Sequence, residues 1–414
     1  MSSFARSSMT VINFDPKIVD KNFPLLIDDF TLAKFLGISN RNLWYMLSQR
    51  NNMEAYKCFS IPRKAKAPGV VPPKREIQEP LGFMKELHAR LNRHFSVVPM
   101  DDSVAAYRKG TRCSDAAGRH VRPSYVFPAN VATITPQEQA LIDDPRYQVR
   151  MVPKVEADTQ SEKVKRYHQP LSMIKMDIRN FFPSIKASWI RSYFRESVGY
   201  SDYVASLLAT LCSVKRMVYQ PNTKPFEVRH LPQGSPLSGS LANLVASHRF
   251  GGALVEMLKE HSPDWVLTIY SDDIIMTHPT LTISKEELDT IKNKAEALVK
   301  QGGFVINSDK SQIKHGNCAS IRILGCIVTH KLNVPNALRK RIGSAFHKCL
   351  KHGFAATCPP DRTVSGYIMY LQGMIEHVKS IRPDLAAKYA DIFNQAKEKY
   401  PSEVRPESVG GELT

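Results

Sequence analysis

The sequence has few of the features that are typical of secreted proteins, membrane-spanning proteins or proteins with structural metal sites. It contains no run of about 18 apolar residues, and its N-terminus lacks the apolar core of a signal peptide. No lipidation signal or membrane-surface helix is recognisable. The seven cysteines are scattered without a CxxC pair, and the spacing of Cys318 and Cys326 does not suit a zinc site. Reduced thiols in a cytoplasm fit this pattern best.

Acidic residues are scarce relative to basic ones. The 414 residues include 57 Lys and Arg against 39 Asp and Glu, which gives a formal charge of +18 at pH 7, and the pI is near 9.5. Because the basic residues run along the whole length, the simplest partner is a polyanion such as nucleic acid. Apolar and charged contents of 43% and 23% are ordinary for a globular protein, and the length predicts two or three domains.

One stretch, VLTIYSDDIIMT from Val266 to Thr277, sets two carboxylates between two apolar runs. Residues on both sides favour strands, so Asp272 and Asp273 are expected in a tight hairpin turn. Adjacent like charges cost free energy unless a cation neutralises them, and oxygen ligands suit Mg²⁺. A solvated surface turn is the alternative that this stretch alone leaves open.

Two segments upstream can join this turn in one site. LSMIKMDIRNFFPSI predicts a buried strand ending at Asp177, followed by a turn into a helix. If that strand neighbours the hairpin in one sheet, the carboxylates converge. HLPQGSPLSGSLANL predicts an irregular Pro- and Gly-rich loop whose backbone approaches a ligand. The small residues that follow open a helix, and we expect them to leave N–H groups exposed for a phosphate or base pair.

The N-terminal part predicts helices and a hairpin. Residues 27–48 predict two short helices, either a pair covering a neighbouring domain or a DNA-reading helix-turn-helix. Residues 56–64 and 74–82 predict two strands joined by a basic tip, which is either a solvated loop or a clamp for phosphates. A basic amphipathic helix follows over 83–96. Residues 123–170 are polar and Pro-rich with weak periodicity, which predicts an insertion.

Helices dominate the remainder of the chain. Residues 283–303 predict an amphipathic helix capped by Ser284, with Glu287 three residues later. Residues 321–335 predict a further hairpin. Residues 336–400 are mostly helical and basic, with breaks at prolines.

In this order, the strand ending at Asp177, the LPQG loop and the YSDD turn resemble the reverse transcriptases, specifically the bacterial group of retron, group II intron and defence-associated enzymes. The resemblance covers roughly residues 56 to 335, and its three central motifs together are highly specific. The segments that carry it are SIPRK, KREIQEP, DIRNFFPSI, LPQGSPLSGSLANL, YSDDII, GFVINSDKSQI and RILGCIV.

The resemblance implies an α+β right-hand polymerase fold with fingers, a palm built on an antiparallel sheet, and a helical thumb. The implied domains are an N-terminal helical extension (1–55), fingers with an insertion around 123–170 (56–172), a palm whose residues of about 190–228 pack with the fingers (173–330), and a helical thumb with a tail (331–414).

The resemblance also implies two-metal nucleotidyl transfer, in which a primer 3′-hydroxyl attacks the α-phosphate of a nucleotide. Asp177 and Asp272 are the expected principal ligands of two Mg²⁺ ions, with Mn²⁺ as a substitute. Asp273 has the same assignment, although a second aspartate of this kind can hold one metal only loosely. The backbone carbonyl of Ile178 is a further expected oxygen ligand.

The nucleotide pocket carries over position by position. Phe182 matches the bulky residue that excludes a 2′-hydroxyl, although a core aromatic is the alternative for it, as is expected for Phe181. Gln233, followed by Gly234 in the same loop, matches the residue that contacts the incoming nucleotide.

Basic residues and a hairpin complete the implied site. Lys64 and Arg75 match the cations that grip the triphosphate, with Lys74 as a substitute. Lys310 is either the proton donor to the leaving pyrophosphate or a plain surface lysine. Leu324-Gly325 matches the primer-grip hairpin, and the basic C-terminal helices match a thumb that follows duplex phosphates.

Two departures narrow the subgroup. Retron enzymes carry NAxxH where this chain reads AAGRH, with Ala116 in place of Asn, and they carry VTG where this chain reads ILG. No RNase H signature appears, and no room is expected for the maturase and endonuclease regions of intron enzymes. The pattern looks most like a standalone defence-associated enzyme, of the type 2 class, that copies its own structured non-coding RNA into cDNA from dNTPs.

Other interpretations stay open at this point. The same fold can serve a template-independent DNA polymerase that extends a primer, or a retron-type enzyme that makes msDNA. A non-catalytic RNA-binding protein on a polymerase scaffold is a third interpretation, which the intact carboxylates disfavour. A homo-oligomer or an effector protein is also compatible with the sequence, whereas a membrane partner is not expected.

Overall fold

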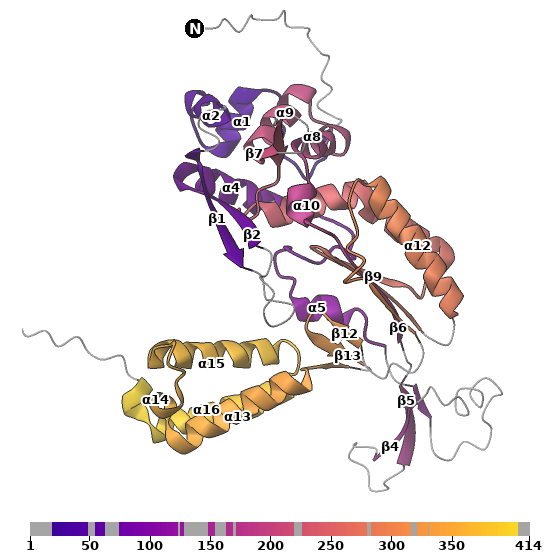
Figure 1. The fold of residues 1–414 in the computed structure, drawn as a ribbon, viewed down its shortest axis with the longest axis vertical. Coiled ribbons are helices and arrows are strands. Elements are labelled where there is room, and N and C mark those ends of the chain that lie inside the picture. Colours follow the sequence, from indigo (N-terminus) through magenta and orange to yellow (C-terminus); the bar gives the residue numbers. More distant parts are fainter. Residues whose placement is uncertain are drawn as a thin grey trace, which may run out of the picture.

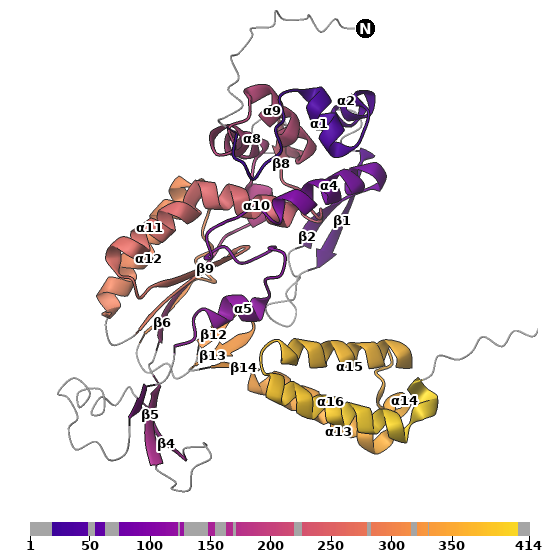
Figure 2. The ribbon, with the colours of Figure 1, turned by 180° about the vertical axis from the view of Figure 1, so that it is seen from behind.

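The computed structural model describes residues 19–48, 54–62, 74–122, 125–127, 148–153, 163–168, 171–218, 226–279, 283–315, 321–329 and 331–404. Figures 1 and 2 show helices with a hairpin at one end of the long axis, a helix-covered sheet in the middle, and a helical bundle that lies to one side below the sheet. In these ranges no helix is both long enough and apolar enough to span a membrane.

The middle part is built on a four-stranded antiparallel sheet in the order β11-β6-β10-β9. Its strands are β6 (Leu171–Asp177), β9 (Val266–Tyr270), β10 (Asp273–Pro279) and β11 (Gln312–Lys314). In the pairing of β6 with β10, Asp273 lies directly opposite Asp177. The two segments that the sequence predicted as strands are therefore neighbours, and their acids meet at one end of the sheet.

Alternation along the strands assigns the two faces of the sheet. The buried apolar side chains form two clusters, a larger core and a second, smaller core. Ile174 and Met176 of β6 belong to the larger core, whereas Met173 belongs to the second core. Asp177 and Lys175 share the face of Met173, because they are separated from it by even numbers of residues. Asp177 and Asp273 consequently lie on the face of the sheet that carries the second core, at the end of β6 and the start of β10.

Helices close the other face of the sheet (Figure 1). They are α7 (Phe181–Ser184), α10 (Ser238–Ala246), the π-helical turn η2 (Ser247–Gly251), α11 (Gly252–His261) and α12 (Lys285–Gln301). The capping box predicted at Ser284 and Glu287 is present, since the Ser284 hydroxyl accepts from the Glu287 amide at 3.1 Å and Glu287 accepts from the Ser284 amide at 2.7 Å.

The N-terminal end combines a hairpin with a group of helices. Its elements are α1 (Asp29–Leu36), α2 (Asn40–Leu47), β1 (Tyr56–Pro62), β2 (Lys74–Pro80), α4 (Gly82–Phe95), α8 (Ala187–Glu196), α9 (Asp202–Leu211), β7 (Val214–Val218) and β8 (Phe226–His230). The two short helices and the β1–β2 hairpin agree with the sequence prediction. Because α1 contacts α4 and α9, and α2 contacts α9, the pair covers neighbouring helices.

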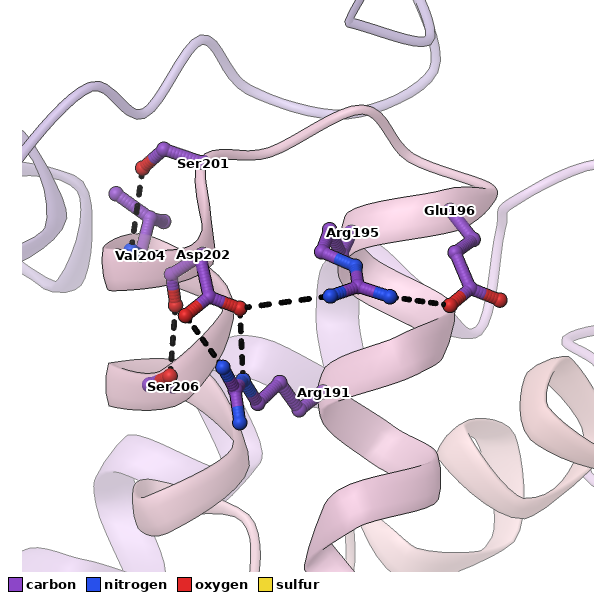
Figure 3. Close-up of polar contacts among 7 residues, drawn as sticks. All are labelled: Arg191, Arg195, Glu196, Ser201, Asp202, Val204 and Ser206. Carbon is purple, nitrogen blue, oxygen red and sulfur yellow. Dashed lines mark hydrogen bonds and ion pairs between the residues drawn. The ribbon is translucent and has the colours of Figure 1, made fainter. Parts of the chain in front are cut away.

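Ion pairs join α8 to the beginning of α9 (Figure 3). Both Arg191 and Arg195 approach the carboxylate of Asp202, and Arg191 donates two hydrogen bonds to it, one of 2.8 Å from Nε. Ser201 caps α9 by accepting from the Val204 amide. These exposed pairs add little stability individually, but they join α8 to α9, and α9 packs against α1 and α2.

The C-terminal end is a helical bundle linked to the sheet by a small hairpin. The link consists of α5 (Cys113–Gly118), β12 (Ile321–Ile323), β13 (Cys326–Val328) and β14 (Leu332–Asn333). The bundle consists of α13 (Asn336–His352), α14 (Phe354–Thr357), α15 (Val364–Lys379), α16 (Pro383–Lys399) and α17 (Pro401–Val404). Phe346 packs between Tyr389 and Phe393 of α16 at its centre. Pro383 opens α16 at its first turn, where a missing N–H costs nothing.

The segment 123–170, predicted as an insertion, contains three strands: β3 (Tyr125–Phe127), β4 (Gln148–Pro153) and β5 (Lys163–His168). They form a separate antiparallel sheet in the order β3-β5-β4. The weak periodicity of this polar segment gave no signal for them, and the rest of the insertion lies outside the described residues.

Two histidines are fully buried, and each links separate segments. His88 of α4 contacts the Ser235 hydroxyl at 2.6 Å and the Leu211 carbonyl at 2.9 Å. His120 contacts the hydroxyls of Thr277 and Thr268 at 2.8 and 2.9 Å, and so bridges β10 and β9. Burial lowers the pKa of His88 to about 4 and that of His120 to about 3, so both rings are neutral at pH 7.

We expect mild acid to destabilise the fold before its carboxylates titrate. In the unfolded chain both histidines take up a proton near pH 6.5, whereas the buried rings do not until about pH 4 and about pH 3. The free energy of unfolding therefore falls as pH falls below about 6.5, by up to about 1.4 kcal/mol per pH unit for each histidine. Urea unfolding at about pH 7.5 and about pH 5.5 measures this loss. The loss should be smaller in His120→Gln, and an equal loss in variant and wild type would contradict the assignment.

Candidate active site

A cleft of about 150 Å³ opens at the end of the sheet where the acids meet. Its walls come from β2, the segment before α5, the end of β6 with α7, the loop before α10, the turn between β9 and β10, and the segment between α12 and β11. The residues that line it are Arg75, Tyr107, Asp177, Ile178, Arg179, Asn180, Phe181, Phe182, Pro183, Gln233, Ser271, Asp272, Asn307 and Lys310. Most of the residues that the sequence singled out are thus brought together.

Asp177 is the most enclosed acid of the cleft. Only 4% of its surface is exposed, yet its carboxylate accepts hydrogen bonds from Asn307 Nδ2 at 3.0 Å and Lys310 Nζ at 2.9 Å. The Asn307 amide also donates to the Asp177 carbonyl at 2.7 Å. Lys310 is therefore a direct partner of the acid, although its side chain is 53% exposed, and its role as a proton donor stays a prediction.

The two other acids occupy different positions in the hairpin. The sequence predicted both in the turn, but only Asp272 lies there, because Asp273 already begins β10. The Asp272 carbonyl accepts from the Ile178 amide at 2.8 Å, which joins the turn to the end of β6. Asp273 is half-buried and paired with Lys175 Nζ at 2.8 Å. Burial raises the pKa of the Asp273 carboxyl above its usual range, against the opposing effect of Lys175.

The LPQG loop is held against β2 by a reciprocal contact. The Gln78 amide donates to the Gln233 carbonyl at 2.8 Å, and the Gln233 amide donates to Gln78 Oε1 at 3.1 Å. Gly234 has φ +128°, and a Cβ there would lie 2.7 Å from Ile77 Cγ2, so glycine is required by conformation and by space. The side chain of Gln233 is left to line the cleft.

The beginning of α10 differs from the sequence prediction. The small residues after the loop were expected to leave N–H groups exposed, but every residue of α10 is buried. The Ser238 hydroxyl donates back to the Pro232 carbonyl at 2.5 Å. The small residues serve close packing here, so the prediction that this helix start is exposed is wrong.

The paired phenylalanines divide between core and cleft. Phe181 is 4% exposed and stacks on Phe304 with ring centroids 5.8 Å apart, as predicted for a core aromatic. Phe182 is half-buried at the cleft wall, 6.0 Å from the ring of Tyr107. Its position is compatible with contact to a bound sugar.

Of the basic residues expected at the tip of the β1–β2 hairpin, Arg75 reaches the cleft. Lys74 is exposed at the start of β2, and Lys64 lies outside the described residues. Gln78 and Ile77, farther along the same strand, contact the LPQG loop, so β2 carries Arg75 toward the acids.

Leu324 and Gly325 do not line this cleft. They form the two-residue turn between β12 and β13, with φ +46° and +86°, the combination of a type I′ turn. Leu324 contributes instead to a separate hollow beside α5 and the end of α15. Their predicted contact with a primer stays a prediction.

Among the cleft residues that the sequence analysis did not single out, Asn307 and Tyr107 contact an acid or the turn that carries one. Asn307 had no signal beyond its place in GFVINSDKSQI, and its role follows from contact with Asp177. Tyr107 precedes an Arg-Lys-Gly stretch; it has φ +53°, and its hydroxyl contacts the Ser271 hydroxyl at 3.2 Å.

The acids fit a divalent cation, although the described residues contain no ready group of three His, Cys, Asp or Glu side chains that could hold a metal ion. Asp177 and Asp272 line the same cleft, and their oxygens are the donors that Mg²⁺ and Mn²⁺ prefer. Lys310 holds one oxygen of Asp177, and Lys175 holds one of Asp273. A metal at this site would compete with these lysines.

We expect Lys310→Met to tighten Mn²⁺ binding about 2- to 5-fold, because the variant loses a half-exposed cation worth up to about 1 kcal/mol at the Asp177 carboxylate. Titration calorimetry on the whole chain measures the change without any reaction. Lys285→Met, at the exposed start of α12, is the matched control and should bind as wild type does. Unchanged or weaker binding by the Lys310 variant would contradict the competition.

Comparisons with known proteins agree with this geometry. Residues 85–328 match the family described as "Reverse transcriptase (RNA-dependent DNA polymerase)". The chain is 24% identical over 229 residues to the retron Mx65 reverse transcriptase of Myxococcus xanthus, covering 53% of this chain and 48% of that protein. It is 25% identical over 206 residues to the retron Ec86 reverse transcriptase of Escherichia coli, covering 48% and 54%. The chain thus spans about half the length of the curated relatives it matches.

Among solved structures, a telomerase from Candida tropicalis in complex with a fragment of telomeric RNA is similar at 12% identity and a TM-score of 0.39, covering 86% of this chain and 59% of that one.

Proposed function

Because the chain belongs to the reverse transcriptase (RNA-dependent DNA polymerase) family, we propose that it synthesises DNA on an RNA template. In the right-hand polymerase fold of this family, the sheet is the palm, the β1–β2 hairpin belongs to the fingers, and the helices after residue 331 form the thumb. The observation that carries the proposal is the cleft itself, where Asp177 and Asp272 face the same space as Arg75, Phe182 and Gln233.

In the proposed reaction, Asp177, Asp272 and the Ile178 carbonyl would hold two Mg²⁺ ions, and Asp273, opposite Asp177 in the sheet, would bind them more loosely. When bound, such ions lower the barrier to attack of a primer hydroxyl on an α-phosphate. The enclosure of Asp177 and the Ile178–Asp272 bond keep the acids in place without rearrangement. Mn²⁺ can take the same ligands.

The other residues of the cleft take complementary parts. Arg75, together with Lys64 or Lys74, grips the triphosphate, and Gln233 contacts the nucleotide from the loop opposite. Phe182 closes the space beside the sugar. Lys310, at hydrogen-bond distance from Asp177, is placed to deliver a proton to the pyrophosphate as it leaves.

The thumb and the primer grip guide the nucleic acid in this proposal. Exposed cations on α13, which include Lys340, Lys348 and Lys351, suit the phosphates of a duplex. The Leu324-Gly325 turn lies between α5 and the thumb helix α15, where a primer strand would pass.

The template that we favour is a structured non-coding RNA that the enzyme copies into cDNA, in bacterial antiviral defence. The support is the similarity to enzymes named as retron reverse transcriptases and the +18 formal charge. The departures at Ala116 and at the ILG sequence favour a standalone enzyme of the defence group over a retron producing msDNA. All six cysteines of the described ranges are free thiols, which suits work in a reducing cytoplasm.

We expect Asp272→Ala combined with Asp273→Ala to abolish dNTP incorporation on a primed RNA template, because the variant loses two of the three carboxylates. RNA binding, which depends on cations elsewhere, should stay within about 2-fold of wild type in a filter-binding or anisotropy measurement. Asp289→Ala, an exposed position on α12, is the matched control and should retain full incorporation. Full incorporation by the double variant would refute the proposal.

The same assay separates the second candidate function. The same cleft would serve a template-independent polymerase, because none of the acids contacts the template in the proposed reaction. If wild-type protein extends a primer equally well without template, and the product sequence does not follow the RNA, the template-independent function is correct.

We expect Phe182→Ala to weaken discrimination against ribonucleotides by roughly 10- to 100-fold, because truncation opens the wall beside the sugar. The ratio of kcat/KM for dNTP over rNTP measures this change. Phe181→Leu is the matched control, since it alters the buried neighbour and should lower stability while leaving the ratio unchanged. A ratio that moves in the Phe181 variant and not in the Phe182 variant would overturn the assignment.

A further inference from the structure

We propose that Tyr107 is a positioning residue for the catalytic turn: its hydroxyl tethers Ser271 and thereby fixes Asp272 relative to Phe182. The inference rests on the proposed function for its kinetic consequence. Its structural basis is independent of that function, because it concerns contacts between the turn and a segment far away in the sequence.

Both partners of the tether have left-handed backbone conformations that side-chain-bearing residues rarely adopt. Tyr107 has φ +53° and Ser271 has φ +58°, and each such residue costs about 1 kcal/mol or more. Their hydroxyls lie 3.2 Å apart. Because strain of this kind persists only where surrounding contacts over-determine it, the two residues are held by something beyond local preference.

The segment that carries Tyr107 is anchored on two sides. The Ile269 amide donates to the Ser103 carbonyl at 2.7 Å, and the Ala105 amide donates to the Ile269 carbonyl at 3.0 Å, which extends the sheet beside β9. On the other side, Asn243 Nδ2 of α10 donates to the Ala106 carbonyl. Tyr107 follows these anchors directly, so its backbone is fixed on the structure that also holds the turn.

The ring of Tyr107 sits where only glycine leaves space for it. A Cβ on Gly239 of α10 would lie 2.4 Å from Tyr107 Cγ, so the ring rests against helix backbone. The residue as a whole is 46% exposed. The ring centroid lies 6.0 Å from that of Phe182. One side chain therefore contacts Ser271 in the turn, Gly239 of α10 and Phe182 at the cleft wall.

The consequence concerns Asp272, the residue after Ser271. Without the hydroxyl contact, Ser271 loses a partner that offsets its unfavourable backbone conformation. The backbone of the turn at Asp272 then becomes more mobile. A displacement of Asp272 would affect the reacting geometry more than the binding of the nucleotide, because the Arg75 and Gln233 contacts come from other elements.

The test compares Tyr107→Phe, Ser271→Ala and the double variant on a primed RNA template. Each single variant should lower kcat by about 2- to 10-fold, the range for one lost hydrogen bond, with KM for dNTP little changed. The double variant should be no slower than the slower single variant, since both remove the same contact. Tyr203→Phe is the matched control: it is also 46% exposed, and its hydroxyl bonds Asp29 far from the cleft. It should keep wild-type kcat.

Hydrogen exchange supplies a readout that does not require activity. Backbone amides of residues 270–274 should exchange faster in Tyr107→Phe and Ser271→Ala than in wild type or Tyr203→Phe, with unchanged protection in α12. If wild-type protein fails to incorporate dNTP, the proposed function is wrong. In that case the hydrogen-exchange comparison alone tests whether Tyr107 tethers Ser271. Wild-type kcat and wild-type exchange in both single variants, or effects that add in the double variant, would overturn the inference.

Discussion

The register between β6 and β10 is the constraint on which the site depends. It sets Asp177 opposite Asp273, and the same register buries Ile174 and Met176 with their partners on β10. A slip by one residue would turn Lys175 and Asp177 into the larger core and remove Ile174 and Met176 from it, and each apolar side chain that lost its burial would cost about 1.5–3 kcal/mol. The apolar alternation of two strands thus determines where the carboxylates stand.

Residues 101–122 stabilise the edge of the sheet beside this pair of strands. β9 is an edge strand, and unpaired edges are open to slippage. Residues 103–105 pair with Ile269, and the neutral His120 ring joins Thr268 to Thr277 across β9 and β10. The Arg119 guanidinium also donates to the Leu267 carbonyl at 3.3 Å. The segment 101–122 thus contacts the edge strand at Leu267, Thr268 and Ile269, and it also carries Tyr107 at the cleft.

Local patterns in the sequence were sufficient for the strands, the capped helix at Ser284 and the carboxylates, because alternation and capping depend on neighbours in the chain. They were insufficient where a role depends on distant packing. The buried start of α10 is set by Tyr107, more than 130 residues earlier. A positive φ at Leu324 has no compositional signal either, since Asn or Gly is the usual residue in such a turn. The relation of Lys310 to Asp177 likewise required the fold.

The lysines beside the acids explain how this fold tolerates three carboxylates at one end of a sheet. Burial raises the pKa of Asp273, the two neighbouring acids add to this rise, and Lys175 opposes it. The Asp177 carboxylate accepts direct hydrogen bonds from Lys310 and Asn307. A divalent cation adds a larger charge at the same oxygens, so it can replace the Lys310 contact without leaving the carboxylate unpaired. Lys310 is half-exposed, and its release into solvent costs little. In the proposed reaction, a metal at Asp177 would free the Lys310 side chain to act on the leaving pyrophosphate.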